Sequence, residues 1–194
     1  MRNYKLTILF LFFSIFIFCQ KTESAEFIKT EKKDTCHPYL NKLVNKQIVK
    51  KIEDGFVIKT NKGTHKFVNN NSDENYIQYE FEGTFQFYHN FDLIKVTEYN
   101  DEYYFLISNE SGKKYKLNGF PIFSSDYKYF ATVNIPYTDE KQIIEVYSYD
   151  FDNINLIKKL ENNSEYFIFQ IVCINKSFVF VEDNNKQVFK IKID

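Results

Sequence analysis

The segment QIVKKIEDGFVIKTNKGTHKFVN, residues 47–69, decides the expected fold, because apolar and polar residues alternate along most of it. Alternation of this kind is typical of a β-strand with one buried face. Asp54-Gly55 and the residues 61–63 interrupt the pattern, and both are rich in residues that tolerate the backbone angles of tight turns. The segment therefore predicts a meander of three antiparallel strands.

The chain after residue 69 repeats the strand signal at short intervals. Runs of β-branched and aromatic residues alternate with turn-forming residues, and we find no sustained helical periodicity. The expected strands are residues 76–81, 83–88, 93–99, 103–108, 114–118, 127–134, 142–149, 155–160, 166–173, 177–181 and 187–193. Short strands spaced by roughly 8 to 12 residues predict an antiparallel all-β protein, built as a meander that is either partly propeller-like or a sandwich.

Composition supports this fold class. The chain has 22 Phe and 15 Tyr but only 5 Gly, and aromatic residues favour strands.

Two weaker patterns precede the meander. Residues 20–35 are polar and of mixed charge, which predicts a flexible leader. Leu40, Leu43 and Val44 have helical spacing, so a short helix over residues 38–46 is an alternative there.

The first nineteen residues have the pattern of an export signal. Arg2 and Lys5 carry positive charge, and residues 6–18 are apolar except for Thr7 and Ser14. The apolar run is shorter than the roughly 20 residues that span a bilayer. We expect cleavage between Cys19 and Gln20, which leaves 175 residues, with residues 36–194 forming one β-rich domain.

Two other fates of the signal stay open. Cys19 directly after an apolar run could be lipidated, as in a bacterial lipoprotein, although Phe18 is larger than the residue that normally precedes such a cysteine. The signal could also stay uncleaved, and a weaker cleavage site follows Ala25. The expected location is therefore the periplasm or the extracellular space, with an outer-membrane lipoprotein as the alternative and membrane attachment only through Cys19.

Cysteine count and charge restrict the function classes. Loss of Cys19 leaves Cys36 and Cys173 in an oxidising compartment, where they could form a disulfide or remain two buried thiols. Loss of Arg2 and Lys5 leaves 23 basic against 26 acidic side chains, a net charge near −3. Because no block of like charges occurs, we expect no nucleic-acid partner.

The sequence GFPIFSSDYKYFA, residues 119–131, resembles the blade motif of propeller proteins, in which a Pro-x-Phe-Ser-Pro-Asp-Gly-Lys stretch turns from one strand to the next. Ser125 replaces the proline of that motif and Tyr127 replaces the glycine. Together with the hairpin at Asp54-Gly55, nearly the whole mature chain is similar to small exported bacterial proteins of uncharacterised activity. The resemblance implies a β-rich fold and no particular activity.

Chain length limits the propeller interpretation. A four-stranded blade needs about 40 to 45 residues, and a closed ring usually has at least about four blades. Residues 84–194 provide two to three blades, and the meander over residues 47–69 extends them to three with part of another. We therefore expect a partial propeller-like meander rather than a complete ring.

The three histidines lack the neighbours that catalysis requires. His37 follows Cys36 and precedes Pro38, which makes the segment extended, and adjacent side chains in an extended segment rarely face each other as a thiol and its base must. His65 lies on an expected hairpin strand, and His89 lies at an expected strand end. We interpret all three as structural or surface residues and predict no catalytic residue among them.

Metal and nucleophile motifs are missing from the sequence. It contains no Cys-x-x-Cys, His-x-His or Gly-x-Ser-x-Gly, and its glycines are scattered singly. The loop over residues 69–75 and the pair Asp150 and Asp152 are better explained as turns than as calcium sites. Ser124 belongs to a turn in the same way. We therefore predict no metal ligand, no cofactor and no cofactor-binding residue.

Paired carboxylates are the remaining candidates for chemistry. Glu80 and Glu82 occupy alternate strand positions and so share a face, and Glu98 could share a face with a neighbouring strand. A solvated strand face explains them equally well. The expected function is an exported, noncatalytic β-rich binding module for an unknown protein or envelope component. The alternatives are an enzyme that acts on envelope glycan or peptide and an inhibitor or immunity-type protein.

Overall fold

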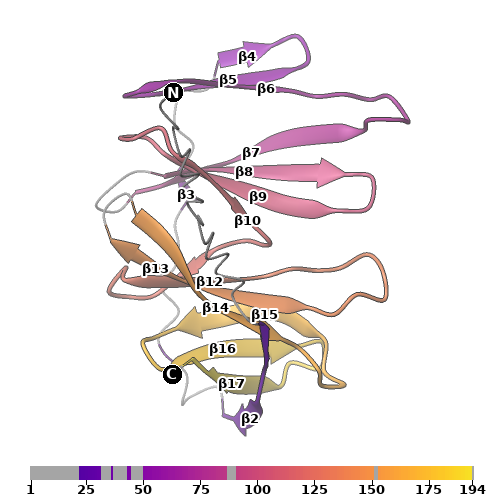
Figure 1. Ribbon diagram of the computed structural model, residues 1–194, viewed down its shortest axis with the longest axis vertical. Coiled ribbons are helices and arrows are strands. Elements are labelled where there is room, and N and C mark those ends of the chain that lie inside the picture. Colours follow the sequence, from indigo (N-terminus) through magenta and orange to yellow (C-terminus); the bar gives the residue numbers. More distant parts are fainter. Residues whose placement is uncertain are drawn as a thin grey trace, which may run out of the picture.

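The computed structural model describes residues 22–31, 36, 43–44, 50–86, 91–150 and 153–193, and every regular element among them is a β-strand. These strands form four sheets that follow one another along the long axis of the molecule (Figure 1). The antiparallel all-β fold predicted from the sequence is confirmed. Because four sheets stack in series, the arrangement is a row of blade-like sheets rather than a two-sheet sandwich.

The first sheet is the meander expected from residues 47–69. It consists of β4 (Lys50–Ile52), β5 (Gly55–Thr60) and β6 (Gly63–Val68), paired antiparallel in sequence order. Gly55 has a φ of 150°, and a Cβ atom at this position would lie 2.0 Å from the carbonyl oxygen of Phe67. The turn at this position therefore requires glycine.

The second sheet has the strand order β10-β9-β8-β7-β3. Its consecutive strands are β7 (Ile77–Phe85), β8 (Phe91–Glu98), β9 (Glu102–Ser108) and β10 (Lys114–Leu117), and β3 (Leu43–Val44) pairs with the other edge of β7. The expectation of separate strands at 76–81 and 83–88 is wrong, because β7 continues through Glu82. A bulge between Phe81 and Gly83 accommodates the extra residue without ending the pairing with β8.

The third sheet contains the segment with the blade-like motif. Its strands are β11 (Ile122–Phe123), β12 (Tyr129–Val133), β13 (Ile143–Asp150) and β14 (Asn153–Glu161). Between β11 and β12, the Asp126 carboxylate accepts hydrogen bonds from Ser124 Oγ at 2.6 Å and from the Lys128 amide at 3.1 Å. Tyr127 has a φ of 55°, so the turn forms with tyrosine in a conformation that favours glycine.

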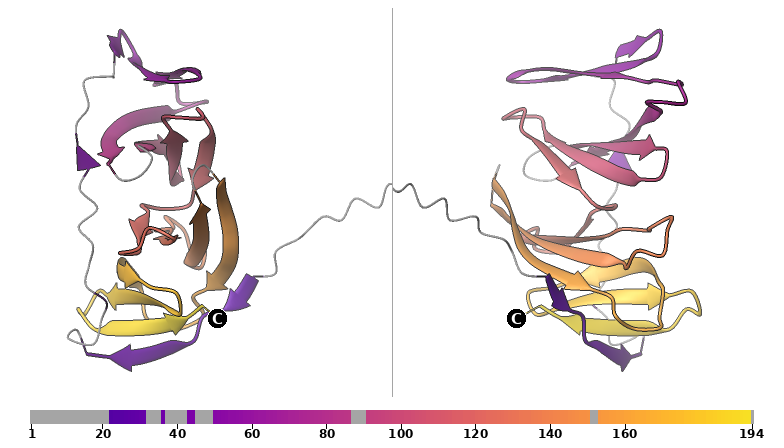
Figure 2. Two further views of the ribbon diagram at one scale, coloured as in Figure 1. Left: turned by 90° about the vertical axis from the view of Figure 1, so that its left-hand side faces the viewer. Right: turned by 45° about the vertical axis from the view of Figure 1, so that its right-hand side comes forward.

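The fourth sheet is completed by the N-terminal part of the chain. Its strands β15 (Ile168–Ile174), β16 (Phe178–Asp183) and β17 (Val188–Lys192) form a meander, and β2 (Phe27–Thr30) pairs antiparallel with β17. Both views in Figure 2 show the indigo β2 beside the yellow C-terminal strands. The first strand, β1 (Thr22–Ser24), pairs parallel with β14 in the third sheet.

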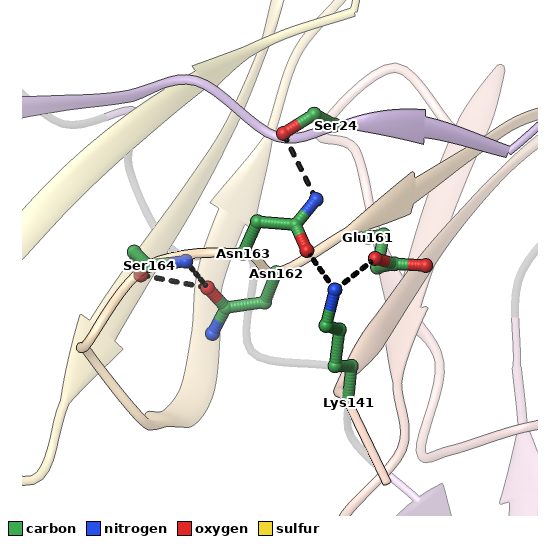
Figure 3. A network of polar contacts seen from close by, with 6 residues as sticks. All are labelled: Ser24, Lys141, Glu161, Asn162, Asn163 and Ser164. Carbon is green, nitrogen blue, oxygen red and sulfur yellow. Dashed lines mark hydrogen bonds and ion pairs between the residues drawn. The ribbon is translucent and has the colours of Figure 1, made fainter.

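We call residues 22–31 the strap, since this segment joins the edges of two sheets. Its β1 half is held mainly by polar groups. The Ala25 amide donates to the Glu161 carbonyl at 2.8 Å, and Asn163 Nδ2 donates to Ser24 Oγ at 3.1 Å. Lys141 donates to both Glu161 and Asn163 in the same network (Figure 3). The β2 half is held by apolar packing, with the Phe27 ring edge-on to Phe189 at 5.8 Å.

The strap corrects the prediction of a flexible leader over residues 20–35. Seven of those residues belong to β1 and β2, because the edges of β14 and β17 provide backbone partners that a local sequence pattern does not reveal. Within the expected helix over residues 38–46, Leu43 and Val44 are described, and they form β3. The rest of that helix, the signal over residues 1–19 and Cys19 lie outside the described residues.

Three apolar clusters fill the spaces between successive sheets. The first cluster includes Phe56, Ile94 and Tyr103, the second includes Leu93, Phe130 and Tyr147, and the third includes Val146, Ile171 and Phe189. Strand β8 contributes to two clusters, with Leu93 on one face and Ile94 on the other. Each inner sheet is therefore buried on both faces, which explains its continuous apolar runs.

A disulfide joins Cys36, which follows the strap in the sequence, to the fourth sheet. Cys36 and Cys173 are bonded, with their Cα atoms 6.0 Å apart, within the usual range for such a bond. The bond that the cysteine count allowed is thereby confirmed, and it joins the N-terminal segment to β15. None of the described residues, from 22 to 193 with the gaps given above, lies in a helix long and apolar enough to cross a membrane.

Candidate binding site

A pocket of about 320 Å³ lies where the second, third and fourth sheets meet. It opens between β9, the connection that precedes β11, the end of β12, and β15. Most of its wall is apolar. The lining residues are Glu102, Tyr104, Gly119, Phe120, Ile122, Val133, Ile135, Phe169, Gln170 and Ile171.

Close packing builds the back of this pocket. The rings of Tyr104 and Phe120 meet edge to face, with centroids 5.9 Å apart, and Phe120 also packs edge-on against Phe85. Gly119 allows β12 to approach, because a Cβ atom there would lie 2.0 Å from the carbonyl oxygen of Val133. The pocket wall is therefore held by the core of the second and third sheets, so its shape is preformed.

Large apolar side chains are exposed at the pocket rim. Ile135 is 54% exposed and Phe169 is 59% exposed, although both line the pocket. Tyr137, in the same loop as Ile135, is 62% exposed. Single exposed apolar residues are common on proteins, but a group of them around a concave site marks a surface that a partner can cover.

A charged group borders the pocket on the face of the second sheet that looks toward the third. Glu80, Lys95 and Tyr104 are neighbours across β7, β8 and β9, and so they share one face of the sheet. Glu102 lies two residues before Tyr104 and points to the same face. Lys95 Nζ forms an ion pair with Glu102 Oε2 at 2.8 Å.

Two tyrosines also donate to Glu102. Tyr137 Oη donates to Glu102 Oε2 at 3.2 Å, and Tyr104 Oη makes a long hydrogen bond of 3.4 Å to Oε1. Burial, reinforced by the charges of Glu102 and Glu82, raises the pKa of Tyr104. Its hydroxyl therefore stays protonated and available as a donor at neutral pH.

Glu82 is the carboxylate with a perturbed pKa in this group. Burial raises the pKa of Glu82 above its ordinary value, the negative charge of Glu80 raises it further, and Lys95 offsets part of the rise. The hydrogen bond to Glu102 raises the pKa of Lys95. Within the described part of the chain, neither Glu80 nor Glu82 forms an ion pair. The border of the pocket therefore carries negative charge that Lys95 does not neutralise.

The other candidates from the sequence lie apart from this pocket. Asp150 pairs with Asn153 at the β13–β14 turn, and His65 faces Ile58 across the first sheet. Glu98 accepts a hydrogen bond from Tyr103 at 2.8 Å. Asn69 and Asn70 bond to nearby backbone amides, which explains their loop without a metal. His37, His89 and Asp152 lie outside the described residues.

Metal binding has no support in this region. The described residues contain no group of three or more His, Cys, Asp or Glu side chains placed to hold a metal ion. Glu80, Glu82 and Glu102 therefore influence one another through charge without forming a coordination site.

A second, more open pocket of about 560 Å³ lies between the second and third sheets. Its charges are already paired, because Lys159 lies 2.7 Å from Glu145, which also accepts a 2.6 Å hydrogen bond from Tyr147. Lys114 and Lys116 contribute to its edge, but their ammonium groups lie over Phe105 and Tyr103. We assign no ligand to this pocket.

Sequence reasoning named no residue that lines the first pocket, but it named two carboxylates close to it. Glu80 lies on the face that carries Glu102, and Glu82, in the bulge of β7, lies close enough to both for their charges to raise its pKa. Sequence reasoning missed Glu102, Ile135, Tyr137 and Phe169. A usable signal existed for Phe169. Phe169 on β15 and Phe167 just before that strand flank buried Ile168 in the sequence, so apolar residues occur at consecutive positions instead of alternating with polar ones. Comparison of the chain with protein-family models, curated proteins and solved structures gave no match.

Proposed function

We propose that this chain is an exported, noncatalytic binding module and that the pocket between β9, β11, β12 and β15 is its binding site. The observation that carries the proposal is the exposure of Ile135 and Phe169 at the mouth of a preformed, largely apolar pocket. Burying exposed apolar surface is the main source of affinity in protein recognition. A partner that covers these two side chains would gain that free energy.

The size of the pocket fits a side chain of a larger partner. A volume of about 320 Å³ is at the lower limit for small-molecule sites, while the apolar rim continues outside the pocket to Tyr137. A partner that inserts one side chain into the pocket and rests its neighbouring residues on the apolar rim would contact both. The proposed partner is therefore a protein or peptide of the cell envelope or its surroundings.

Export is part of the proposal. The signal-like residues 1–19 and the Cys36–Cys173 disulfide both fit an oxidising compartment outside the cytoplasm. We propose the periplasm or the extracellular space, with attachment to a membrane only if Cys19 is lipidated. An intact-mass measurement of the exported protein tests this, because lipidation adds the mass of the acyl chains and simple cleavage does not.

A screen of short peptides tests the binding function. The mature chain is applied to an array of peptides of varied sequence, in parallel with Phe169→Ser and Phe167→Ser variants. Both phenylalanines are exposed and lie two residues apart, but Phe169 lines the pocket and Phe167 does not. We expect Phe169→Ser to lose the bound peptides and Phe167→Ser to retain them. Equal binding by all three proteins, or none by the mature chain, would refute the proposal.

One observation favours an enzyme as a second candidate. Glycoside hydrolases use one carboxyl group with a raised pKa and a second ionised carboxylate, and Glu82 with its raised pKa lies near the ion-paired Glu102. Hydrolysis of isolated envelope glycan, followed by reducing-sugar release, tests this alternative. If the unmodified protein released reducing sugar and the Glu82→Gln variant did not, the enzyme would be established over a purely binding role.

A further inference from the structure

We infer that the pocket accepts an arginine side chain of a protein partner, with an apolar residue of the same partner resting on the rim. This inference rests on the proposed binding function and specifies its ligand. Three properties of the site support it: its charge, the chemistry of its walls, and the apolar surface around its mouth.

The charge of the site favours a cation. Glu80 and Glu102 share one face of the second sheet, and Glu82 lies close enough to feel the charge of both. Among the described residues, Lys95 is the cation that interacts with Glu82 and Glu102. Asp101, next to Glu102, adds to the negative charge felt by Tyr137. A bound cation would relieve the repulsion among these carboxylates, and partial burial from water strengthens that attraction.

Glu102 has bonding capacity for such a cation. Its Oε2 atom already accepts from Lys95 and Tyr137, whereas among the described residues Oε1 accepts the 3.4 Å hydrogen bond from Tyr104 and no other. A carboxylate oxygen can accept two hydrogen bonds. A donor that enters the pocket can therefore bond to Oε1 without displacing Lys95.

The walls favour arginine over lysine. The planar guanidinium group stacks on aromatic rings and is more weakly hydrated than an ammonium group. Tyr104, Phe120 and Phe169 provide aromatic surface inside the pocket, and Ile122 and Ile135 provide aliphatic surface for the methylene stem. Glu102 at the pocket wall supplies the acceptor for the guanidinium end.

The exposed rim indicates a partner larger than free arginine. Phe169 lines the pocket but stays mostly exposed, and Tyr137, which does not line the pocket, is also mostly exposed. An apolar residue next to the arginine would cover them. A peptide or a protein loop offers this combination, whereas a free amino acid or a polyamine does not.

Fluorescence anisotropy with the mature chain tests the inference. The probes are three labelled short peptides. The first has an arginine flanked by two leucines, the second has citrulline in place of the arginine, and the third keeps the arginine but has both leucines replaced by glycine. We expect the citrulline peptide and the glycine peptide each to bind about tenfold more weakly than the arginine peptide. Citrulline keeps the shape of arginine but removes its charge.

Matched variants connect the binding to the site. Glu82→Gln should lower the affinity for the arginine peptide about threefold at low salt, which is the effect expected of removing a partly exposed charge. Glu53→Gln serves as the control, because Glu53 is an exposed carboxylate in the turn between β4 and β5 and does not line the pocket. We expect it to leave the affinity unchanged.

The possible outcomes separate the two proposals. Equal binding of the arginine and citrulline peptides, or no binding of either, would overturn the arginine inference. If the array peptides nevertheless depended on Phe169, the binding function would stand with another ligand class. If they did not depend on Phe169, the binding function itself would fail.

Discussion

The side chain of Gln142 forms both backbone hydrogen bonds of Ile168. Its Nε2 atom donates to the Ile168 carbonyl at 2.9 Å, and its Oε1 atom accepts from the Ile168 amide at 2.7 Å. The pair is buried, with Gln142 4% exposed. Ile168 is also paired with Asp183 of β16, so this amide side chain bonds to the start of β15 in addition to its strand partner and joins the third sheet to the fourth.

Replacing Gln142 by leucine should lower the free energy of unfolding by about 2–4 kcal/mol, because two buried backbone groups of Ile168 would lose their partners. Urea unfolding measures this change. Gln78→Leu is the control, since the Gln78 side chain bonds to Asn71 at an exposed position and should change stability by less than about 0.5 kcal/mol. Equal effects of the two substitutions would contradict the role assigned to Gln142.

Gly119→Ala should destabilise the protein by about 2 kcal/mol or more, because the added Cβ atom would lie 2.0 Å from the Val133 carbonyl oxygen and force β12 to move. Gly63→Ala provides the matched control, since nothing lies within 4 Å of a Cβ atom there. Thermal unfolding compares the two variants. If both melted at the same temperature, the close approach of Gly119 and Val133 would be refuted.

Removing the disulfide by Cys36→Ser together with Cys173→Ser should lower stability by about 2–5 kcal/mol, since the bond closes a long loop in the unfolded chain. Denaturant unfolding of the oxidised protein and the double variant measures the loss. The intact mass of the oxidised protein should also be about two hydrogens below that of the reduced chain. A mass equal to that of the reduced chain would show free thiols and contradict the structure.

Glu82→Gln should stabilise the protein at neutral pH. Because the folded state raises the pKa of Glu82, it binds the proton more tightly than the unfolded chain, and wild-type stability falls as the pH rises through that folded pKa. Glutamine removes this loss, so we expect a gain of about 0.5 kcal/mol at neutral pH and almost none at about pH 3. Urea unfolding at both pH values measures it, and a destabilised variant at neutral pH would contradict the assigned environment.

Local sequence patterns were sufficient for most of the strands. Alternation and turn residues over residues 47–69 correspond directly to β4, β5 and β6, because each strand of a hairpin finds its partner a few residues away. The bulge at Glu82 was missed since Gly83 looks like a strand end, whereas the pairing with β8 continues past it. The pattern of apolar and polar residues in a sequence does not show whether the pairing of two strands ends or is only distorted by a bulge.

Contacts between residues far apart in the sequence could not be predicted from local patterns. β1 pairs with β14 more than 130 residues later, and its exposed residues carry no apolar signal. The pocket was missed for the same reason. Glu102 lies on the second sheet, Ile135 in the loop after β12 of the third sheet and Phe169 on the fourth sheet, and the three meet only because these sheets stack. The sequence could offer Cys36 and Cys173 only as a disulfide or as two buried thiols, because local patterns do not show that their Cα atoms lie 6.0 Å apart.

Methyl NMR of isoleucine-labelled protein tests the central claim most directly, because isoleucines lie both in the pocket and far from it. Ile122, Ile135 and Ile171 line the pocket, whereas Ile58 is buried in the first sheet. On titration with the tightest peptide from the array, the account predicts shifts in the resonances of the three pocket isoleucines and none in that of Ile58. Binding without shifts at Ile122, Ile135 and Ile171 would contradict the assignment of this pocket as the binding site.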